Sequence, residues 1–216
     1  DQPRSRGLGD VYKRQEQKAL MSTTDVGSVQ TYDYEGDCGT VDFFNPEAQK
    51  FVWSKCKQNY RDWGIDLFWL DNSEPDSTTY DFENYRYYTG RGSKVGCEYP
   101  KKYVEAFCNG QEAEGDHEAV NLCRSAWVGS QKYRTLVWTG DVQSNFESFK
   151  DQVIAGQNMG LAGIPWWTTD IGGFMTDNWD DPDFKELLIR WYQYGSVLPY
   201  PAHARKPRPR LGYPQA

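Results

Sequence analysis

One stretch of the chain reads Gly64-Ile65-Asp66-Leu67-Phe68-Trp69-Leu70-Asp71-Asn72-Ser73-Glu74-Pro75-Asp76. Its apolar residues between Ile65 and Leu70 form an almost unbroken run, which is typical of a strand buried on both faces of a parallel sheet. The run ends at Asp71, and turn-forming residues follow. A carboxylate at the end of a parallel strand lies where barrel folds place their functional groups, although Asp71 could also simply cap the loop.

Three later segments repeat this pattern of an apolar run that ends in a charged residue. They are Ala119–Arg124, Leu136–Asp141 and Gly163–Asp170. Because the carboxyl ends of parallel strands meet at one face of a barrel, the repeat predicts that Asp71 and the three later charged residues share one polar mouth.

The segments between these runs carry helix signals. Asn45-Pro46-Glu47 starts a helix that stops before Gly64, Ser144–Glu147 forms a capping box for a helix that runs toward Asn158, and Asp181-Pro182-Asp183 starts another helix. We also expect a helix near Pro100–Cys108, a short strand at Thr40–Phe44, and a long functional connection over Ser77–Gly96. Alternating strands and helices predict parallel β/α units. An open doubly wound sheet would show the same alternation, but no glycine-rich phosphate loop follows any strand.

Composition narrows the classes of function. A net charge of −7 argues against nucleic acid or an anionic membrane surface as a partner. No apolar run approaches the roughly 20 residues of a membrane span. The five cysteines are odd in number and lack a C-x-x-C pair, and the two histidines fall outside metal-ligand spacing, so we expect neither a metal nor a cofactor. The nine Trp and fifteen Tyr could stack on sugar rings, although most are expected to fill the core.

Both ends of the chain differ in composition from the middle. Residues 1–15 include Asp10–Gln15, which looks like the translated end of a transposon used in sequencing libraries, and we interpret this segment as adapter-derived. Residues 200–216 form an atypical tail that is either frame-shifted or disordered. The 216 residues are also short for a whole eight-unit barrel of roughly 250 residues. We therefore assign residues 16–199 to part of a catalytic barrel.

Two aspartates at strand ends, with an arginine beside them and tryptophans nearby, suggest glycoside cleavage. That reaction needs one carboxylate to attack the anomeric carbon and another to protonate the leaving oxygen. Asp71 suits the nucleophile, and Arg124 could hold charge or a sugar hydroxyl by paired hydrogen bonds. Asp141 follows a flexible Thr139-Gly140 turn, which could aim its side chain at a leaving group.

The same motifs resemble those of glycoside hydrolase family 31, the α-glucosidase and α-xylosidase family. Phe68–Glu74 resembles its nucleophile signature, Arg124–Trp127 its arginine segment, Trp138–Asp141 its acid/base signature and Gly163–Phe174 its following pocket segment. The four motifs occur in family order between about Thr40 and Pro199. The resemblance implies a (β/α)8 TIM barrel, here a partial barrel covering its C-terminal half.

The resemblance also implies roles for individual residues in a retaining, exo-acting enzyme. Asp71 would be the nucleophile and Asp141 the acid and then the base. Five residues would bind the sugar, namely Arg124, Trp138, Asp170, Phe174 and Trp69, and Glu74 and Asp76 would orient the loop. Two positions depart from the family pattern. Arg134 stands where the family usually has glycine, and His203 fits poorly as the family's sugar-contacting histidine.

The implied partner is an oligosaccharide or small α-glycoside, and α-xylosidase is the preferred substrate assignment. The Trp-Leu-Asp and Ser-Glu-Pro variant around Asp71 favours it. α-Glucosidase is the close alternative, because the two sugars differ only by a hydroxymethyl group, which a pocket discriminates by roughly 1–3 kcal/mol. A rival of another class is a non-catalytic carbohydrate-binding module.

Overall fold

The computed structural model describes residues 19–33, 37–74, 82–175 and 180–199. The segments predicted to be adapter-derived (1–15) and atypical (200–216), with His203, therefore lie outside the described residues, as does Asp76. The chain divides into two compact units, Asp1–Thr135 and Leu136–Ala216. Within the described residues, no helix is both long and apolar enough to cross a membrane.

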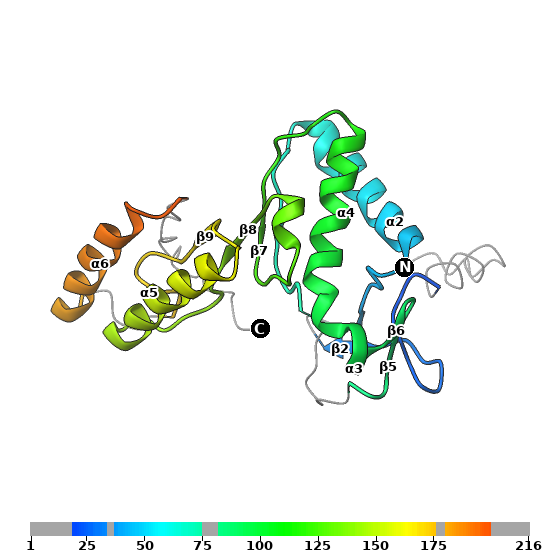
Figure 1. The fold of residues 1–216 in the computed structure, drawn as a ribbon, viewed down its shortest axis with the longest axis horizontal. Coiled ribbons are helices and arrows are strands. Elements are labelled where there is room, and N and C mark those ends of the chain that lie inside the picture. The colour runs from blue at the N-terminus through cyan, green and yellow to red at the C-terminus, as the bar shows by residue number, and fades with distance from the viewer. Residues whose placement is uncertain (1–18, 34–36, 75–81, 176–179, 200–216) are drawn as a thin grey trace, which may run out of the picture. The chain divides into compact units, whose positions relative to one another are not determined.

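The first unit combines short strands with two long helices that lie side by side (Figure 1). In chain order its elements are β1 (Thr23–Thr24), β2 (Thr31–Asp33), β3 (Asp37–Gly39), α2 (Pro46–Asn59), η1 (Arg61–Trp63), β4 (Trp69–Leu70), β5 (Tyr85–Tyr87), β6 (Gly90–Arg91), α3 (Gly92–Val95), η2 (Gly96–Glu98), α4 (Tyr99–Ala113), β7 (Asn121–Cys123) and η3 (Ser130–Tyr133).

Helix α2 begins as predicted, and the strand expected at Thr40–Phe44 is reduced to a single bridge. Asn45 caps the helix by accepting a hydrogen bond from the Glu47 N–H, and Pro46 occupies the first turn. Val41 pairs with Met21 in an isolated antiparallel bridge, and a turn follows at residues 43 and 44. The buried Asp42 carboxylate stabilises this turn by accepting the backbone N–H groups of Phe44 and Tyr88. Burial raises the pKa of Asp42, against the opposing effect of these hydrogen bonds.

Strand β4 is shorter and less buried than its sequence predicted. In this unit Leu70 is 2% exposed, but Leu67 and Trp69 are 63% and 48% exposed. The buried face of the run packs on the helices, where Phe68 contacts Trp53 of α2 and Phe107 of α4. The strand is therefore buried on one face only, and the expectation of two buried faces is wrong for this unit.

The long connection predicted over 77–96 contains regular structure. Antiparallel β5 and β6 form a hairpin, and α3 and η2 follow it directly. Tyr85 and Tyr87 are both buried, with Arg86 between them, so the period of two is that of a half-buried strand. The three residues of β5 are two tyrosines and an arginine, so its sequence does not show the aliphatic run of a typical core strand. For this reason a loop was expected there.

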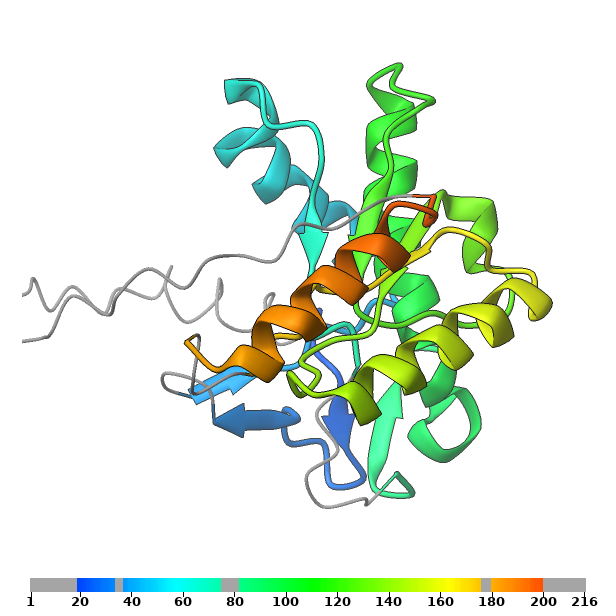
Figure 2. The same ribbon diagram turned by 90° about the vertical axis from the view of Figure 1, so that its left-hand side faces the viewer.

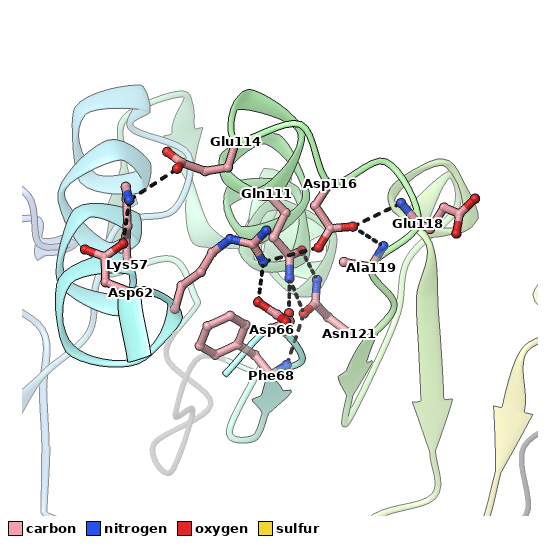
Figure 3. A network of polar contacts seen from close by, with 11 residues as sticks. Lys57, Asp62, Asp66, Phe68, Gln111, Glu114, Asp116, Glu118, Ala119 and Asn121 are labelled. Atoms are coloured by element: carbon pink, nitrogen blue, oxygen red, sulfur yellow. Dashed lines mark hydrogen bonds and ion pairs between the residues drawn. The ribbon is translucent and has the colours of Figure 1, made fainter. Parts of the chain in front are cut away.

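A polar network ties the amino ends of β4 and β7 to α4 (Figure 3). The fully buried amides of Gln111 and Asn121 bond to each other at 2.7 Å, with the Asn121 Nδ2 as donor. Asn121 Oδ1 also accepts the Phe68 N–H, and Gln111 Nε2 donates to the Asp66 carbonyl oxygen at 2.8 Å. Arg61 lies between the Asp66 and Asp116 carboxylates, at 3.1 and 3.2 Å. This network fixes how β4 lies against β7.

The second unit contains a parallel strand pair and two helices that lie side by side (Figure 1 and Figure 2). Its elements are β8 (Thr135–Trp138), α5 (Phe146–Leu161), β9 (Trp167–Thr168) and α6 (Pro182–Gly195). Asp181 caps α6 as predicted, by accepting the Asp183 N–H. The buried face of α6 carries the predicted Phe184, Leu187 and Trp191, and Trp191 packs against Phe149 of α5.

The cap of α5 differs from the predicted capping box. Asn145, not Ser144, is the N-cap, and its Oδ1 accepts the Ser148 N–H at 2.7 Å. The Ser144 backbone N–H instead donates to the Met175 carbonyl oxygen, which places Ser144 in the loop before the helix. Asn and Ser are comparable cap residues, so the sequence alone could not choose between adjacent positions.

Candidate active site

Strand register brings Asp71 and Arg124 to neighbouring strand ends in the first unit. Parallel β4 and β7 pair Trp69 with Leu122 and Leu70 with Cys123. One step further along both strands, Asp71 lies opposite Arg124, and alternation returns both side chains to the face that carries Trp69. Leu70 and Cys123 point to the buried face, and burial raises the pKa of the Cys123 thiol strongly.

The two hydrogen bonds that described residues donate to the Asp71 side chain fall on the same oxygen. Oδ1 accepts the Asn72 N–H at 2.8 Å and lies 3.4 Å from Arg124 Nη1. No hydrogen bond from the described residues reaches Oδ2. Within this part of the chain, the carboxylate is therefore held through Oδ1 alone. Glu74 lies further away, with its Oε2 3.9 Å from Arg124 Nε.

The loop after β4 is held against the loop after β7 by two serines. The fully buried Ser73 hydroxyl accepts the Ser125 N–H at 3.2 Å and lies 3.1 Å from the Ser125 hydroxyl. Asn72 adopts a left-handed backbone with φ 48°, which reverses the chain directly after Asp71. These contacts fix the turn that carries the carboxylate. Neither serine was predicted to have this role.

In the second unit, Asp141 and Asp170 follow the ends of β8 and β9. The strands pair Val137 with Trp167 and Trp138 with Thr168, and the next pair is joined by a hydrogen bond from Thr139 Oγ1 to Thr169 Oγ1 at 3.2 Å. Asp141 is exposed and Asp170 is half-buried. Among the residues that the structure describes, none donates a hydrogen bond to the Asp141 carboxylate, which contrasts with the anchored Asp71.

The loop that carries Asp141 is tied to the loop that follows Asp170. The Phe174 N–H donates to the Val142 carbonyl oxygen at 2.9 Å, and the Ser144 N–H donates to the Met175 carbonyl oxygen at 3.1 Å. Gly173 makes this approach possible. Its φ is 78°, and a Cβ there would lie 2.7 Å from Ser144 Oγ and 2.9 Å from Ser144 Cα. The close approach of these two loops therefore requires glycine at position 173 of the predicted pocket segment.

The predicted sugar-binding aromatics occupy different environments. Trp138 is buried at the end of β8, whereas Trp69 and Phe174 are among the exposed large hydrophobic residues. Trp127, the last residue of the predicted arginine segment, also lies just after a strand end and is exposed as well. This segment was predicted to line the pocket, but Trp127 was given no role of its own. Within the described residues, no group of three or more His, Cys, Asp or Glu side chains could hold a metal ion.

Residues 4–211 match the Glycosyl hydrolases family 31 TIM-barrel domain. The chain belongs to glycoside hydrolase family 31. This confirms the resemblance drawn from the four motifs, and it confirms the β/α barrel as the fold class. An open doubly wound sheet is excluded.

Two sequence relatives and one solved structure show how this family 31 chain compares. It is 49% identical over 189 residues to an uncharacterised family 31 glucosidase, ORF2 of Pseudescherichia vulneris, covering 88% of this chain and 36% of that protein. It is 32% identical to α-xylosidase A of Aspergillus niger, covering 88% of this chain and 30% of that protein. A family 31 α-xylosidase from a soil metagenome, crystallised with xylose, superposes with a TM-score of 0.85 at 47% identity, covering 94% of this chain and 30% of that one. The chain thus spans about a third of the length of these relatives.

Proposed function

We propose that this family 31 chain supplies the nucleophile and the acid/base of a retaining exo-α-glycosidase that removes terminal α-linked xylose. The observation that carries the proposal is the Asp71 carboxylate at the end of β4. Its Oδ1 is held by Arg124 and by the Asn72 N–H, and none of the described residues donates a hydrogen bond to its Oδ2. A nucleophile needs this combination of a fixed position and one available oxygen.

In the first step, Asp71 Oδ2 attacks the anomeric carbon of the terminal sugar. The bond from that carbon to the glycosidic oxygen breaks, and Asp141 gives its proton to the departing oxygen. A sugar ester of Asp71 remains. Arg124 keeps Oδ1 in place during the attack, because its guanidinium contacts that oxygen and the β7 strand end fixes its backbone.

In the second step, water adds to the anomeric carbon from the side that the leaving group vacated. Asp141, now a carboxylate, takes the proton of that water, and the ester bond to Asp71 breaks. The mechanism requires the two carboxyl groups to lie about 5–5.5 Å apart. The exposed Asp141 carboxylate, without donors among the described residues, can rotate to serve both steps.

The remaining predicted site residues take supporting roles in this proposal. Trp69 lies on the same strand face as Asp71 and presents an exposed indole, and Phe174 presents an exposed ring beside the Asp141 loop. Asp170 and Trp138 end the β9 and β8 segments and would line the sugar pocket. Glu74 would hold Arg124 from its other side, given the 3.9 Å approach to Nε.

The preference for xylose rests on the relatives and on the loop motif around Asp71. The A. niger relative and the soil-metagenome structure are both named as α-xylosidases. α-Glucosidase remains the alternative, supported by the glucosidase name of the P. vulneris relative and by α-glucosidase 2 of Bacillus thermoamyloliquefaciens, at 30% identity.

The test uses a chimera because the chain spans about a third of its relatives. In this chimera, called the graft, residues 19–199 replace the matching segment of the soil-metagenome α-xylosidase. We expect the graft to hydrolyse an aryl α-xyloside. The variant Asp71→Ala should lose on the order of 10⁶-fold in kcat, as enzymes do without their nucleophile. A folded but inactive graft would support the remaining alternative, an inactive carbohydrate-binding segment.

Trapping the intermediate separates the two carboxylates. The variant Asp141→Ala should still form the ester with a substrate whose leaving group needs no proton, and water attack should then slow by about 10²–10⁴-fold without its base. Mass spectrometry should find the sugar on Asp71, and added azide should restore turnover. A label on Glu74 or Asp141, or a lack of azide rescue, would contradict the assigned roles.

A further inference from the structure

Trp127 is a large exposed aromatic residue that the proposed mechanism does not use. It follows Arg124 by three positions, and it is 45% exposed. Arg124 contacts the Asp71 carboxylate, so a ligand bound at these strand ends could reach an exposed indole on the same loop.

The backbone under Trp127 is fixed by a tight turn. The Trp127 N–H donates to Ser130 Oγ at 3.0 Å, and the Ser130 N–H donates to the Trp127 carbonyl oxygen at 2.9 Å. Ser130 is fully buried, and its own carbonyl oxygen accepts Thr135 Oγ1 at 2.7 Å. Gly129 closes the turn with φ 94°, a conformation that favours glycine. The indole is therefore presented from a rigid base.

The turn lies at the same strand ends as Asp71. Ser125 bonds to Ser73, which follows Asp71 by two residues. Trp127 is two residues beyond Ser125, and two residues span at most about 7 Å. The Trp127 backbone is thus within that distance of a residue bonded to the nucleophile loop.

We infer that Trp127 stacks on the second sugar of the substrate, the unit on the leaving-group side of the cleaved bond. This rests on the proposed function. Arg124 contacts the Asp71 carboxylate and so belongs with the sugar under attack, whereas Trp127 lies further along the loop, past the strand end. A rigid indole offers a flat apolar face to a sugar ring at little entropic cost. The substrate class is therefore a xyloside whose leaving group is itself a sugar.

The experiment compares two substrates in the graft. α-Xylosyl fluoride has a one-atom leaving group, and an α-xylosyl-glucose disaccharide has a full second sugar. We expect Trp127→Ala to lower kcat/KM for the disaccharide by about tenfold and to leave kcat/KM for the fluoride within twofold. Trp127→Phe should keep most of the disaccharide activity. Val128→Ala, a change at an exposed residue of the same turn, is the matched control and should affect neither substrate.

Each outcome bears on one proposal. An equal loss on both substrates, with a lower melting temperature, would mean that Trp127 packs against protein, and the inference would be wrong. An unchanged disaccharide rate in Trp127→Ala would also overturn it. If the graft with Trp127 intact is folded and hydrolyses neither substrate, the proposed function fails instead.

Discussion

Arg134 occupies a backbone conformation that usually calls for glycine. Its φ and ψ are 52° and 44°, in the left-handed region, at the end of η3. This explains why the family pattern has glycine there. In this chain the side chain compensates, since Nε donates to the Ala119 carbonyl oxygen at 2.9 Å and Nη1 donates to Glu112 Oε1 at 2.8 Å. The long side chain ties η3 to the start of the β7 segment and to the end of α4.

This gives a prediction for two variants at one position. Arg134→Ala loses both contacts and keeps the backbone strain, whereas Arg134→Gly loses the contacts but relieves the strain. We expect the glycine variant to be more stable than the alanine variant by roughly 1 kcal/mol. Thermal melting of the graft should rank them in that order. An alanine variant at least as stable as the glycine variant would refute the strain argument.

The same contact has a pH dependence. The hydrogen bond from Arg134 holds the pKa of Glu112 below its ordinary value of 4.5. A carboxyl with a lowered pKa in the folded state stabilises the fold above its unfolded pKa, and this contribution is lost as the pH falls through the folded pKa. The melting difference between the wild type and Arg134→Ala should therefore narrow below about pH 4.5. A gap that stays constant would mean that the pair contributes no charge-dependent stability.

At the scale of elements, the positions of strand ends and helix starts were predicted more accurately than the burial of individual side chains. Asp71, Arg124, Asp141 and Asp170 all follow strands, and Asn45 and Asp181 both cap helices. These are local signals, because a charge after an apolar run and a cap before a proline act within a few residues. Burial depends on what lies across the sheet. For that reason Tyr85 and Tyr87 were not recognised as core residues, and the exposed face of β4 was not foreseen.

The loop between β9 and α6 offers a prediction about Asp141. In Gly173→Ala, a Cβ would press on Ser144 and on the Gln143 carbonyl oxygen, which lies 3.0 Å away, and the left-handed φ would add strain. The segment that carries Asp141 should shift, so kcat/KM of the graft should fall by about 10²-fold, as it does for small misplacements of catalytic groups.

Gly160→Ala is the matched control for that prediction. It lies in α5, nothing lies within 4 Å of the added Cβ, and its φ is not left-handed. This change should leave activity intact and stabilise the protein by up to about 1 kcal/mol through helix propensity. Equal activity losses in both variants would point to general damage to the second unit instead of a displaced Asp141.

At the scale of the whole molecule, composition and motif order led to the barrel family, and the match over residues 4–211 confirms it. What the motifs could not give is which strand faces have partners within this chain. Barrel strands are buried on both faces only when neighbouring strands and core layers are all present. This chain spans about a third of the length of its relatives, and within it one face of β4 is buried. The aromatic cluster of Trp53, Phe68 and Phe107 covers that face.

Leu67 tests this interpretation because its environment should differ between two proteins. In the 216-residue chain it is 63% exposed, on the strand face that leads to Asp71. In the graft, the same face should lie in the packed interior of a complete barrel. Leu67→Ser should therefore change the free energy of unfolding by less than about 0.5 kcal/mol in the chain alone. In the graft it should cost about 2–5 kcal/mol, as large-to-small changes in cores do, and the buried hydroxyl adds to the cost of the cavity.

Leu161→Ser is the control for this prediction. It changes an 87% exposed position that ends α5, and it should be close to neutral in both proteins. Urea unfolding of the four variants measures the differences, and an equally small effect of Leu67→Ser in both proteins would show that this face stays outside the barrel core.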